Sequence, residues 1–478
     1  MSERIGEDVV IVGAGAAGLA AAVALSGAGA RVTLVERKPY VGGRAYSYLH
    51  PALDEVIDSQ HVLLGCCTNL IDLCRLAGAD KHIRWYDEIP FLEPGTDGAA
   101  ARRTVLKPGW LPSPGHFASS FQRAPMLKMR DKMGIARGLT LFLRGIPADD
   151  REAFSEWVRR TGQTERAIRH FWEPVVVSTL NDVFERCSTR SAAQVFCESF
   201  LRSAEGGRFG IPTQPLSEFY AAVAQKAESQ ETKVRLRSSV ECIERTPDGE
   251  WSATASDGTR YIAPTLLLAL PFEQAGKLLA TIRDPTAAQR EVIESLERFV
   301  HAPITTIHLW LDREVTELDH AALLDTRIQW MFNKTRIRRR EPGTTANGRQ
   351  YLELVISASF DELRKDREQI LVDAREELAR FFPEARAAKV VKAAVLKEAQ
   401  ATFSVTPGLD KFRPNPDIFD DGLFLAGDWT QSGWPSTMEG AIRSGRLAAE
   451  KIADATGDSR RFVTPDLPPR GFMRMLAR

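Results

Sequence analysis

The sequence lacks any pattern that would hold a metal ion, and it lacks a long apolar run. Its six cysteines and eight histidines form no C-x-x-C pair, no H-E-x-x-H cluster and no other metal-ligand spacing. No stretch reaches the roughly 18 consecutive apolar residues that a membrane-spanning helix needs. We therefore predict no metal site, no transmembrane segment and cysteines that stay reduced, as they do in a cytoplasm.

Net charge is also absent, because lysine plus arginine and aspartate plus glutamate both number 63. Without a field of one sign, nothing directs the chain to nucleic acid, and we predict no nucleic-acid partner. The opening residues MSERIGEDVV lead straight into a strand pattern, which leaves no room for a signal peptide and favours a cytoplasmic protein. The length allows two or three domains.

The most informative stretch is residues 8–44. The apolar run Val9–Val12 predicts a strand buried on both faces of a parallel sheet. A G-x-G-x-x-G pattern follows, then an alanine-rich helix, and then a second strand that ends at Glu36. Strand, glycines, helix, strand and acid in this order predict a dinucleotide-binding βαβ unit.

Each residue type in this unit suits one task in binding a dinucleotide. Gly13 permits the tight turn, Gly15 lets the backbone approach a pyrophosphate, and Gly18 lets the helix pack close to the strand. The helix N-terminus, with Ala17 in its first turn, offers N–H groups to phosphates. Glu36 lies where a carboxylate accepts from a ribose hydroxyl, and the adjacent residue Arg37 is a further candidate contact.

A second glycine pair, Gly42-Gly43, precedes Arg44 and gives another loop of close approach with a guanidinium suited to phosphate. This run of glycines, acid and G-G-R resembles the flavin-containing amine oxidase and phytoene desaturase superfamily, in which the dinucleotide is FAD. The resemblance implies an α/β fold, with a discontinuous Rossmann-type FAD-binding domain and a second substrate domain of mixed sheet and helices.

Composition and resemblance together divide the chain into interleaved units. The FAD-binding domain is predicted over 1–92, 205–298 and 406–458, the substrate-binding domain over 93–204 and 299–405, and a basic amphipathic tail over 459–478. Residues 93–110 are rich in turn formers and are predicted as a linker. Residues 154–201 have helical periodicity, in which Trp157, Phe171 and Trp172 are either core aromatics or part of an apolar tunnel.

Residues 422–452 carry the predicted second half of the FAD site. A buried strand ends at Gly427 and Asp428, and a helix begins near Ser436, so a carboxylate and a helix N-terminus share the edge where open α/β sheets bind ligands. The resemblance implies that Asp428 hydrogen-bonds near the ribityl chain and that the amide at Met438 donates to the flavin C2 carbonyl. This block contains no cysteine, so FAD is predicted to be non-covalent.

Two further strands are predicted for the same domain. Lys233–Glu244 alternates between apolar and polar residues and is predicted as one strand. The resemblance implies that this strand passes the adenine, with backbone contacts at Val240. Thr265–Phe272 is predicted as a buried strand that closes the domain.

Residues 58–70, F-W-E-P at 171–174 and T-L-N at 179–181 resemble the squalene-associated FAD-dependent enzymes, the hydroxysqualene dehydroxylases. Ser59 and Cys67 stand where that family usually has glycine and tyrosine. The resemblance implies reductive dehydroxylation of hydroxysqualene to squalene in hopanoid or squalene biosynthesis, with hydride passing from N5 of reduced flavin to an allylic cation. It also implies a hydrophobic isoprenoid substrate in an apolar tunnel, while the electron donor stays unidentified.

The same resemblance places Gln60 and His61 near the flavin ring. Loss of the substrate hydroxyl needs a general acid. His61 is the first candidate because histidine titrates near neutral pH, and Asp58 is the second because a carboxyl in an apolar tunnel has a raised pKa. The alternative is that His61 only packs beside the flavin.

Two other functions stay open. Carotenoid-type desaturases and amine oxidases share the scaffold but run hydride onto oxidised flavin, and a fold does not distinguish these reactions. A non-catalytic prenyl-binding carrier of the same architecture is the remote alternative. The intact glycines, Glu36, Arg44 and Asp428 argue against a carrier.

One segment departs from the balanced charge of the chain. Residues 119–145 contain six basic residues and one acid, and the tail ends in PPRGFMRMLAR, which mixes arginines with apolar residues. One interpretation is peripheral docking on an anionic surface at the inner face of the cell membrane. The other is a solvated helical face.

Overall fold

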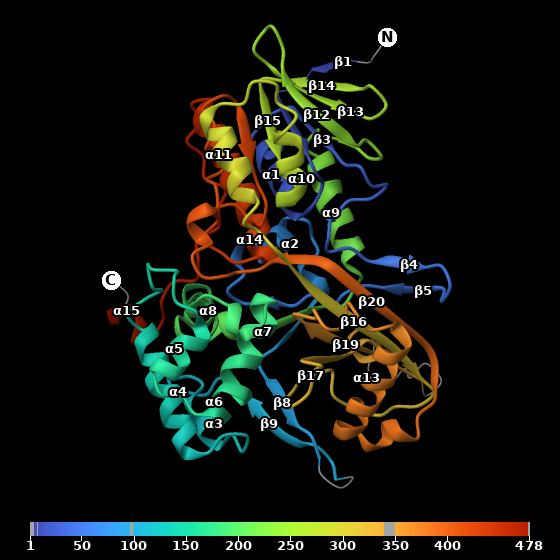
Figure 1. Ribbon diagram of the computed structural model, residues 1–478, viewed down its shortest axis with the longest axis vertical. Helices are drawn as coiled ribbons and strands as arrows, with labels where there is room; N and C mark the ends of the chain where they lie inside the picture. Colours follow the sequence, from blue (N-terminus) through green and yellow to red (C-terminus); the bar gives the residue numbers. More distant parts are fainter. Residues whose placement is uncertain (1–3, 7, 96–98, 339–348, 477–478) are drawn as a thin grey trace.

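The structure is a computed structural model that describes residues 4–6, 8–95, 99–338 and 349–476. Figure 1 shows an upper part built on a parallel sheet and a lower part in which a long mixed sheet lies beside a group of helices. The chain passes between the two parts several times, so each is assembled from segments far apart in sequence. None of the helices in these ranges is long and apolar enough to cross a bilayer.

The upper part contains a five-stranded sheet in which every neighbouring pair is parallel. Alternate residues of its central strand enter two separate hydrophobic cores: Val9 and Ile11 join one, and Val10 and Val12 join the other. Burial on both faces explains why this strand is a continuous apolar run. In spatial order the strands are β11 (Lys233–Arg235), β3 (Val32–Val35), β2 (Val9–Val12), β15 (Thr265–Leu268) and β21 (Leu423–Leu425).

Helices cover this sheet, and α1 packs against both α14 and α9. Most of the small residues of α1 are buried, which allows the close approach of these helices. The helices of the upper part are α1 (Ala16–Gly27), α2 (Thr68–Leu76), α9 (Leu216–Glu228), α10 (Phe272–Leu279), α11 (Ala287–Leu296) and α14 (Met438–Ala455).

Three small sheets complete this region. One joins β1 (Arg4–Gly6), β14 (Arg260–Ala263), β13 (Trp251–Ala255) and β12 (Val240–Arg245); the next joins β6 (Leu63–Leu64), β10 (Phe209–Pro212) and β7 (Ile83–Tyr86); the last is the hairpin of β4 (Tyr48–His50) and β5 (Glu55–Ile57). The single strand predicted over 233–244 is therefore wrong, because β11 and β12 belong to different sheets. Between them Arg237 has a φ of 59°, and its N–H donates to Lys38 O, which turns the chain.

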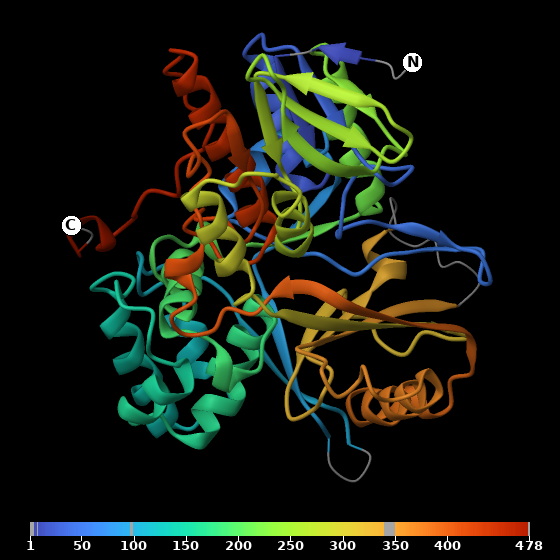
Figure 2. The same cartoon turned by 45° about the horizontal axis from the view of Figure 1, so that its top comes forward.

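The lower part is organised by a seven-stranded sheet, whose longest strands are β16 and β20 (Figure 2). Its order is β20 (Val390–Phe403), β16 (His301–Leu311), β19 (Gln350–Ser357), β18 (Trp330–Asn333), β17 (His320–Leu323), β8 (Ile89–Glu93) and β9 (Arg102–Leu106). Helix α13 (Arg367–Phe381) packs on it through Ile370, Ala374, Leu378 and Phe381.

Two expectations about 89–110 need correction. The predicted linker contains β9, which pairs with β8 from Ile89↔Leu106 to Glu93↔Arg102. The predicted boundary between residues 92 and 93 also falls inside β8, which belongs to the seven-stranded sheet. Turn-forming residues at the tip of this hairpin gave the appearance of a linker, while its arms are too short to show a clear alternation.

In the helical group, residues 154–201 are helical, as their periodicity predicted, and the interpretation of their aromatics as core residues holds. Trp157, Phe171 and Trp172 are 4%, 3% and 0% exposed, and none of the three lines the pocket described below. Trp172 Nε1 donates to Gln163 Oε1 at 2.9 Å, so its polar atom is paired. The group contains α3 (Ala118–Arg123), α4 (Met129–Phe142), α5 (Phe154–Arg160), α6 (Glu165–Ala167), α7 (Glu173–Leu180), α8 (Thr189–Phe196) and the π-helical segments η2 (Ile168–Trp172) and η4 (Cys197–Leu201). Two short helices lie elsewhere, α12 (Lys334–Ile337) and α15 (Met473–Leu476).

Candidate active site

A large pocket of about 1300 Å³ lies at the C-terminal ends of β2, β3 and β21 and extends along the seven-stranded sheet. Ordinary small-molecule sites measure about 300–1,000 Å³, so this pocket has room for a dinucleotide and a second ligand. All the predicted site residues line it except Gly18 and Asp58. Those that do are Gly13, Gly15, Ala17, Glu36, Arg37, Gly43, Arg44, Gln60, His61, Val240, Gly427, Asp428 and Met438.

The turn after β2 forms a cradle of bare backbone. Gly13 has a φ of 106°, and a Cβ on Gly18 would lie 1.9 Å from Gly13 O, so Gly18 permits close helix–strand packing and does not face the pocket. A Cβ on Gly15 would meet only Gly43 Cα, at 3.9 Å. The two backbones thus flank a space that side chains would fill. Helix α1 begins there without a side-chain cap, which leaves its first N–H groups for an anion.

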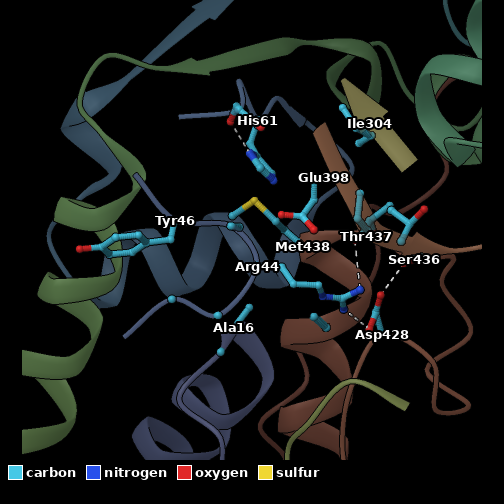
Figure 3. Close-up of a pocket in the computed structure, with 18 of the residues that line it drawn as sticks. Ala16, Arg44, Tyr46, His61, Ile304, Glu398, Asp428, Ser436, Thr437 and Met438 are labelled. Carbon is cyan, nitrogen blue, oxygen red and sulfur yellow. Dashed lines mark hydrogen bonds and ion pairs between the residues drawn. The ribbon is translucent and has the colours of Figure 1, made fainter. Parts of the chain in front are cut away.

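The opposite wall carries a fixed carboxylate and a second helix N-terminus (Figure 3). Arg44 Nη2 lies 2.6 Å from Asp428 Oδ1, and Ser436 Oγ donates to the other oxygen of Asp428. Thr437 caps α14 with its side chain, and Met438 is the first residue of that helix. The carboxylate and the helix start therefore lie together, as the strand–helix pattern of 422–452 predicted.

Comparison with known proteins decides the family. The profile of the flavin containing amine oxidoreductases matches residues 16–453, which is most of the chain. The chain belongs to this family. Its fold is also that of a putrescine oxidase variant, with a TM-score of 0.71 at 16% identity over 95% of this chain and 100% of that one.

Two curated relatives are carotene desaturases. The chain is 24% identical to the 15-cis-phytoene desaturase of Solanum lycopersicum over an alignment of 459 positions, which covers 93% of this chain and 77% of that one. It is 26% identical to the probable zeta-carotene desaturase of Synechococcus elongatus, over 94% of this chain and 98% of that one.

As a flavin containing amine oxidoreductase, the chain is an enzyme, and its cofactor is FAD. The predicted α/β fold class is confirmed. Glu36 fits the expected ribose contact: it is 7% exposed and accepts from Ala14 N at 2.9 Å and Lys38 N at 2.8 Å. Because a carboxylate has about four lone-pair sites, it keeps capacity for a ribose hydroxyl. Bound FAD supplies hydride chemistry that no side chain provides.

His61 lines the pocket, but its surroundings favour the neutral ring. Its Nδ1 lies 2.7 Å from Ser59 O, so the proton sits on Nδ1 and the lone pair on Nε2. Burial lowers the pKa of His61 below its usual value. The imidazolium that a general acid needs therefore forms only below the ordinary histidine range, and the predicted acid role is weakened.

Asp58 was predicted as a second acid with a raised pKa, and this prediction is wrong. The residue is 4% exposed and does not line the pocket. Its Oδ1 lies 3.1 Å from Lys334 Nζ and 2.9 Å from Arg338 Nη2. Burial raises the pKa of this carboxyl, but the two cations together lower it by more. The pKa of Asp58 therefore falls below its usual value. Asp58 is therefore a carboxylate at neutral pH.

The same buried cation holds the segment that carries His61. Lys334 Nζ donates to Gln60 Oε1 at 2.6 Å and lies 3.2 Å from Glu353 Oε2, and Glu353 Oε1 accepts from Gln60 N at 2.5 Å. Gln60 Nε2 in turn donates to His61 O at 2.7 Å. The network fixes the backbone of 58–61 against β19. No local pattern reveals this network, because its members are far apart along the chain.

Glu198 is a candidate that sequence reasoning missed. It lines the pocket from η4 and is 4% exposed. Burial raises its pKa to about 7, although Arg202 Nη1 lies 2.7 Å from Oε2 and lowers it in part. A carboxyl that is partly protonated at neutral pH is suited to donate a proton. A lone glutamate in a helical segment carries no motif, so only the fold reveals it.

Proposed function

We propose that the enzyme reduces hydroxysqualene to squalene with FAD, by loss of the substrate hydroxyl. The observation that carries the proposal is the wall of the pocket beyond the predicted flavin position. It is aromatic and aliphatic, as a long isoprenoid without polar handles requires. Its members come from β10 and the seven-stranded sheet and are Phe209, Ile304, Trp330, Phe332 and Val355.

The aromatic rings of this wall stack on one another. Phe209 and Trp330 stack with centroids 5.1 Å apart, and Trp330 and Phe332 stack at 5.8 Å. Trp330 Nε1 donates to Ser178 Oγ at 2.9 Å, so the polar atom of this ring is already paired. A flexible chain of apolar carbons gains burial there without leaving a donor unsatisfied.

The residues of this chain have three tasks in the proposed reaction. The apolar wall binds the hydrocarbon and excludes water. A proton must reach the leaving hydroxyl, and Glu198 or His61 holds it. The Lys334 network keeps Gln60 and His61 in place. An electron donor of unidentified nature must reduce the cofactor before each turnover.

Carotene desaturation is the second candidate, because curated relatives of the chain are named as phytoene and zeta-carotene desaturases. Such substrates are also long isoprenoids, so the same wall suits them. The two reactions differ in direction: desaturation leaves reduced cofactor, and dehydroxylation consumes it. The state of the cofactor that supports turnover therefore separates them.

The test uses purified holoprotein without oxygen. Reduced protein is incubated with hydroxysqualene, and oxidised protein with phytoene plus a quinone acceptor, and the products are identified by mass. The proposal predicts squalene from the first reaction and unchanged phytoene from the second. A desaturated carotene together with unchanged hydroxysqualene would replace the proposal by its rival. Release of FAD on acid precipitation would support non-covalent binding.

A further inference from the structure

The four most exposed large apolar side chains of the described residues fall in two segments far apart in sequence. Trp110 is 86% exposed in the loop after β9, Met129 and Met133 are each 61% exposed on α4, and Met475 is 73% exposed in α15. Single exposed apolar residues are ordinary, whereas a group of them marks a binding surface.

The fold brings the C-terminal tail against the loop that carries Trp110. Phe472 N donates to Ser113 O at 2.9 Å, and Arg470 N donates to Arg202 O at 3.0 Å. A Cβ on Gly471 would lie 2.7 Å from Ser113 O, so only glycine allows this approach. Figure 1 shows α15 at the edge of the helical group.

The same loop is continuous with α3 and α4. Trp110, Gln122 and Arg123 line one shallow hollow of about 510 Å³, and Lys132 Nζ of α4 donates to Gln122 O at 2.5 Å. We call this surface the docking face. It consists of residues 107–113, α3, α4 and residues 470–475.

The exposed charge of the docking face has one sign. The single acid of 119–145, Asp131, is 4% exposed, and its carboxylate accepts hydrogen bonds within the protein from Lys128 N and Thr164 Oγ1. The basic residues remain at the surface, and the tail adds Arg470 and Arg474, both exposed. In a chain of zero net charge, this local excess of positive charge attracts an anionic partner.

The docking face also adjoins one end of the active-site pocket. Glu198 and Ser199 of η4 line the pocket, and Arg202, less than two turns further on, holds the tail. Phe117, next to the loop, lies 5.6 Å from Phe200 between ring centroids. One helical layer therefore separates the face from a pocket built for an apolar ligand.

We propose that the docking face lies on a lipid bilayer that contains anionic headgroups. The basic residues meet the headgroups, and the ring of Trp110 and the side chains of Met129, Phe472 and Met475 enter the interface. A bilayer accounts for both the positive charge and the exposed apolar side chains of this surface, because neither water nor an acidic peptide would bury such apolar groups. The proposal does not depend on which isoprenoid the enzyme uses.

Vesicle sedimentation of the holoprotein tests the proposal. Vesicles of phosphatidylcholine alone are compared with vesicles that also contain phosphatidylglycerol, at low and high salt. The protein should pellet with the anionic vesicles, and salt should release it. Arg470→Gln with Arg474→Gln should weaken the apparent affinity by about fivefold per charge. Trp110→Ser with Met475→Ser should weaken it further and reduce the binding that survives salt.

A matched pair of substitutions controls for general loss of apolar surface. Leu49 and Val372 are 59% and 49% exposed on β4 and α13, outside the docking face. Leu49→Ser with Val372→Ser should leave vesicle binding unchanged, and all variants should keep a full complement of FAD. Equal pelleting with neutral and anionic vesicles, or equal losses from the control pair, would overturn the proposal. So would a dimer in lipid-free solution that Trp110→Ser with Met475→Ser converts to a monomer, because the face would then bind a second copy.

Discussion

At the scale of single residues, the pH dependence of turnover separates the two candidate proton donors. Burial raises the pKa of Glu198 to about 7 and lowers the pKa of His61. A donor with a pKa of about 7 works below that pH, so turnover should fall about tenfold per pH unit above it. If His61 were the donor, the fall would begin below the ordinary histidine pKa of about 6.5.

Two variants check this assignment by their pH profiles. Glu198→Gln should lower the turnover rate by roughly 10²–10⁴-fold. It should also abolish the fall in turnover above pH 7 (the basic limb of the pH–rate profile) while keeping FAD. His61→Gln should keep the limb. A limb near pH 7 that persists in Glu198→Gln would exclude Glu198 as the donor.

The buried Lys334 gives a second prediction at this scale. Its side chain is 2% exposed and faces Asp58 and Glu353, so Lys334→Met leaves two carboxyls without their shared cation. Removal of one partner from a buried pair costs about 3–5 kcal/mol of unfolding free energy. Lys365→Met is the control, because its ion pair with Asp373 is near the surface and is worth about 1 kcal/mol at most.

Denaturant unfolding of the two variants provides the measurement. If Lys334→Met and Lys365→Met lost equally little unfolding free energy, the buried network would not stabilise the 58–61 segment. Because burial raises the pKa of Glu353 to about 7, above its unfolded value, the stability of the parent protein should fall as pH rises from about 4.5 towards 7.

At the scale of elements, the contact between α1 and α14 aligns the two halves of the FAD site. A Cβ on Gly445 of α14 would lie 2.0 Å from Ala17 O of α1, and Ala17 lines the pocket. Gly445→Ala should therefore push the helices apart, lower the unfolding free energy by about 1–3 kcal/mol and weaken FAD retention. Gly134→Ala on α4, where the nearest atom is Gln163 Oε1 at 3.4 Å, should be neutral or slightly stabilising.

Thermal unfolding and the FAD content after gel filtration measure both effects. An intact FAD content in Gly445→Ala would show that α14 does not depend on this contact for its position.

Local patterns predicted the elements that bind the dinucleotide, and they missed what depends on distant partners. The glycines with Glu36, and the 422–452 block, each form a pattern within a short stretch of sequence. The glycine turn, the acid and the start of the second helix could therefore be predicted. Strands β11 and β12 are separated by Arg237, which an alternating pattern does not reveal. Asp58 was misassigned because Lys334 and Arg338, which set its charge, lie far along the chain.

At the scale of the whole molecule, the interleaved chain places an apolar wall, built mostly on the seven-stranded sheet, beside a dinucleotide cradle built on the parallel sheet. Neither half is a site alone: the cradle lacks a substrate surface, and the seven-stranded sheet lacks phosphate-binding backbone. The family and its cofactor follow from the first half, and the proposed isoprenoid chemistry rests on the second. The direction of hydride transfer is the point on which the proposal depends.

The most direct test of that direction is the stoichiometry of cofactor reoxidation. FAD in the holoprotein is fully reduced without oxygen and mixed with excess hydroxysqualene, and the return of its oxidised absorption is followed together with squalene formed. The account predicts one squalene for each FAD reoxidised, in a single turnover that stops until reductant is added. Cofactor that stays reduced while hydroxysqualene is unchanged would contradict the account.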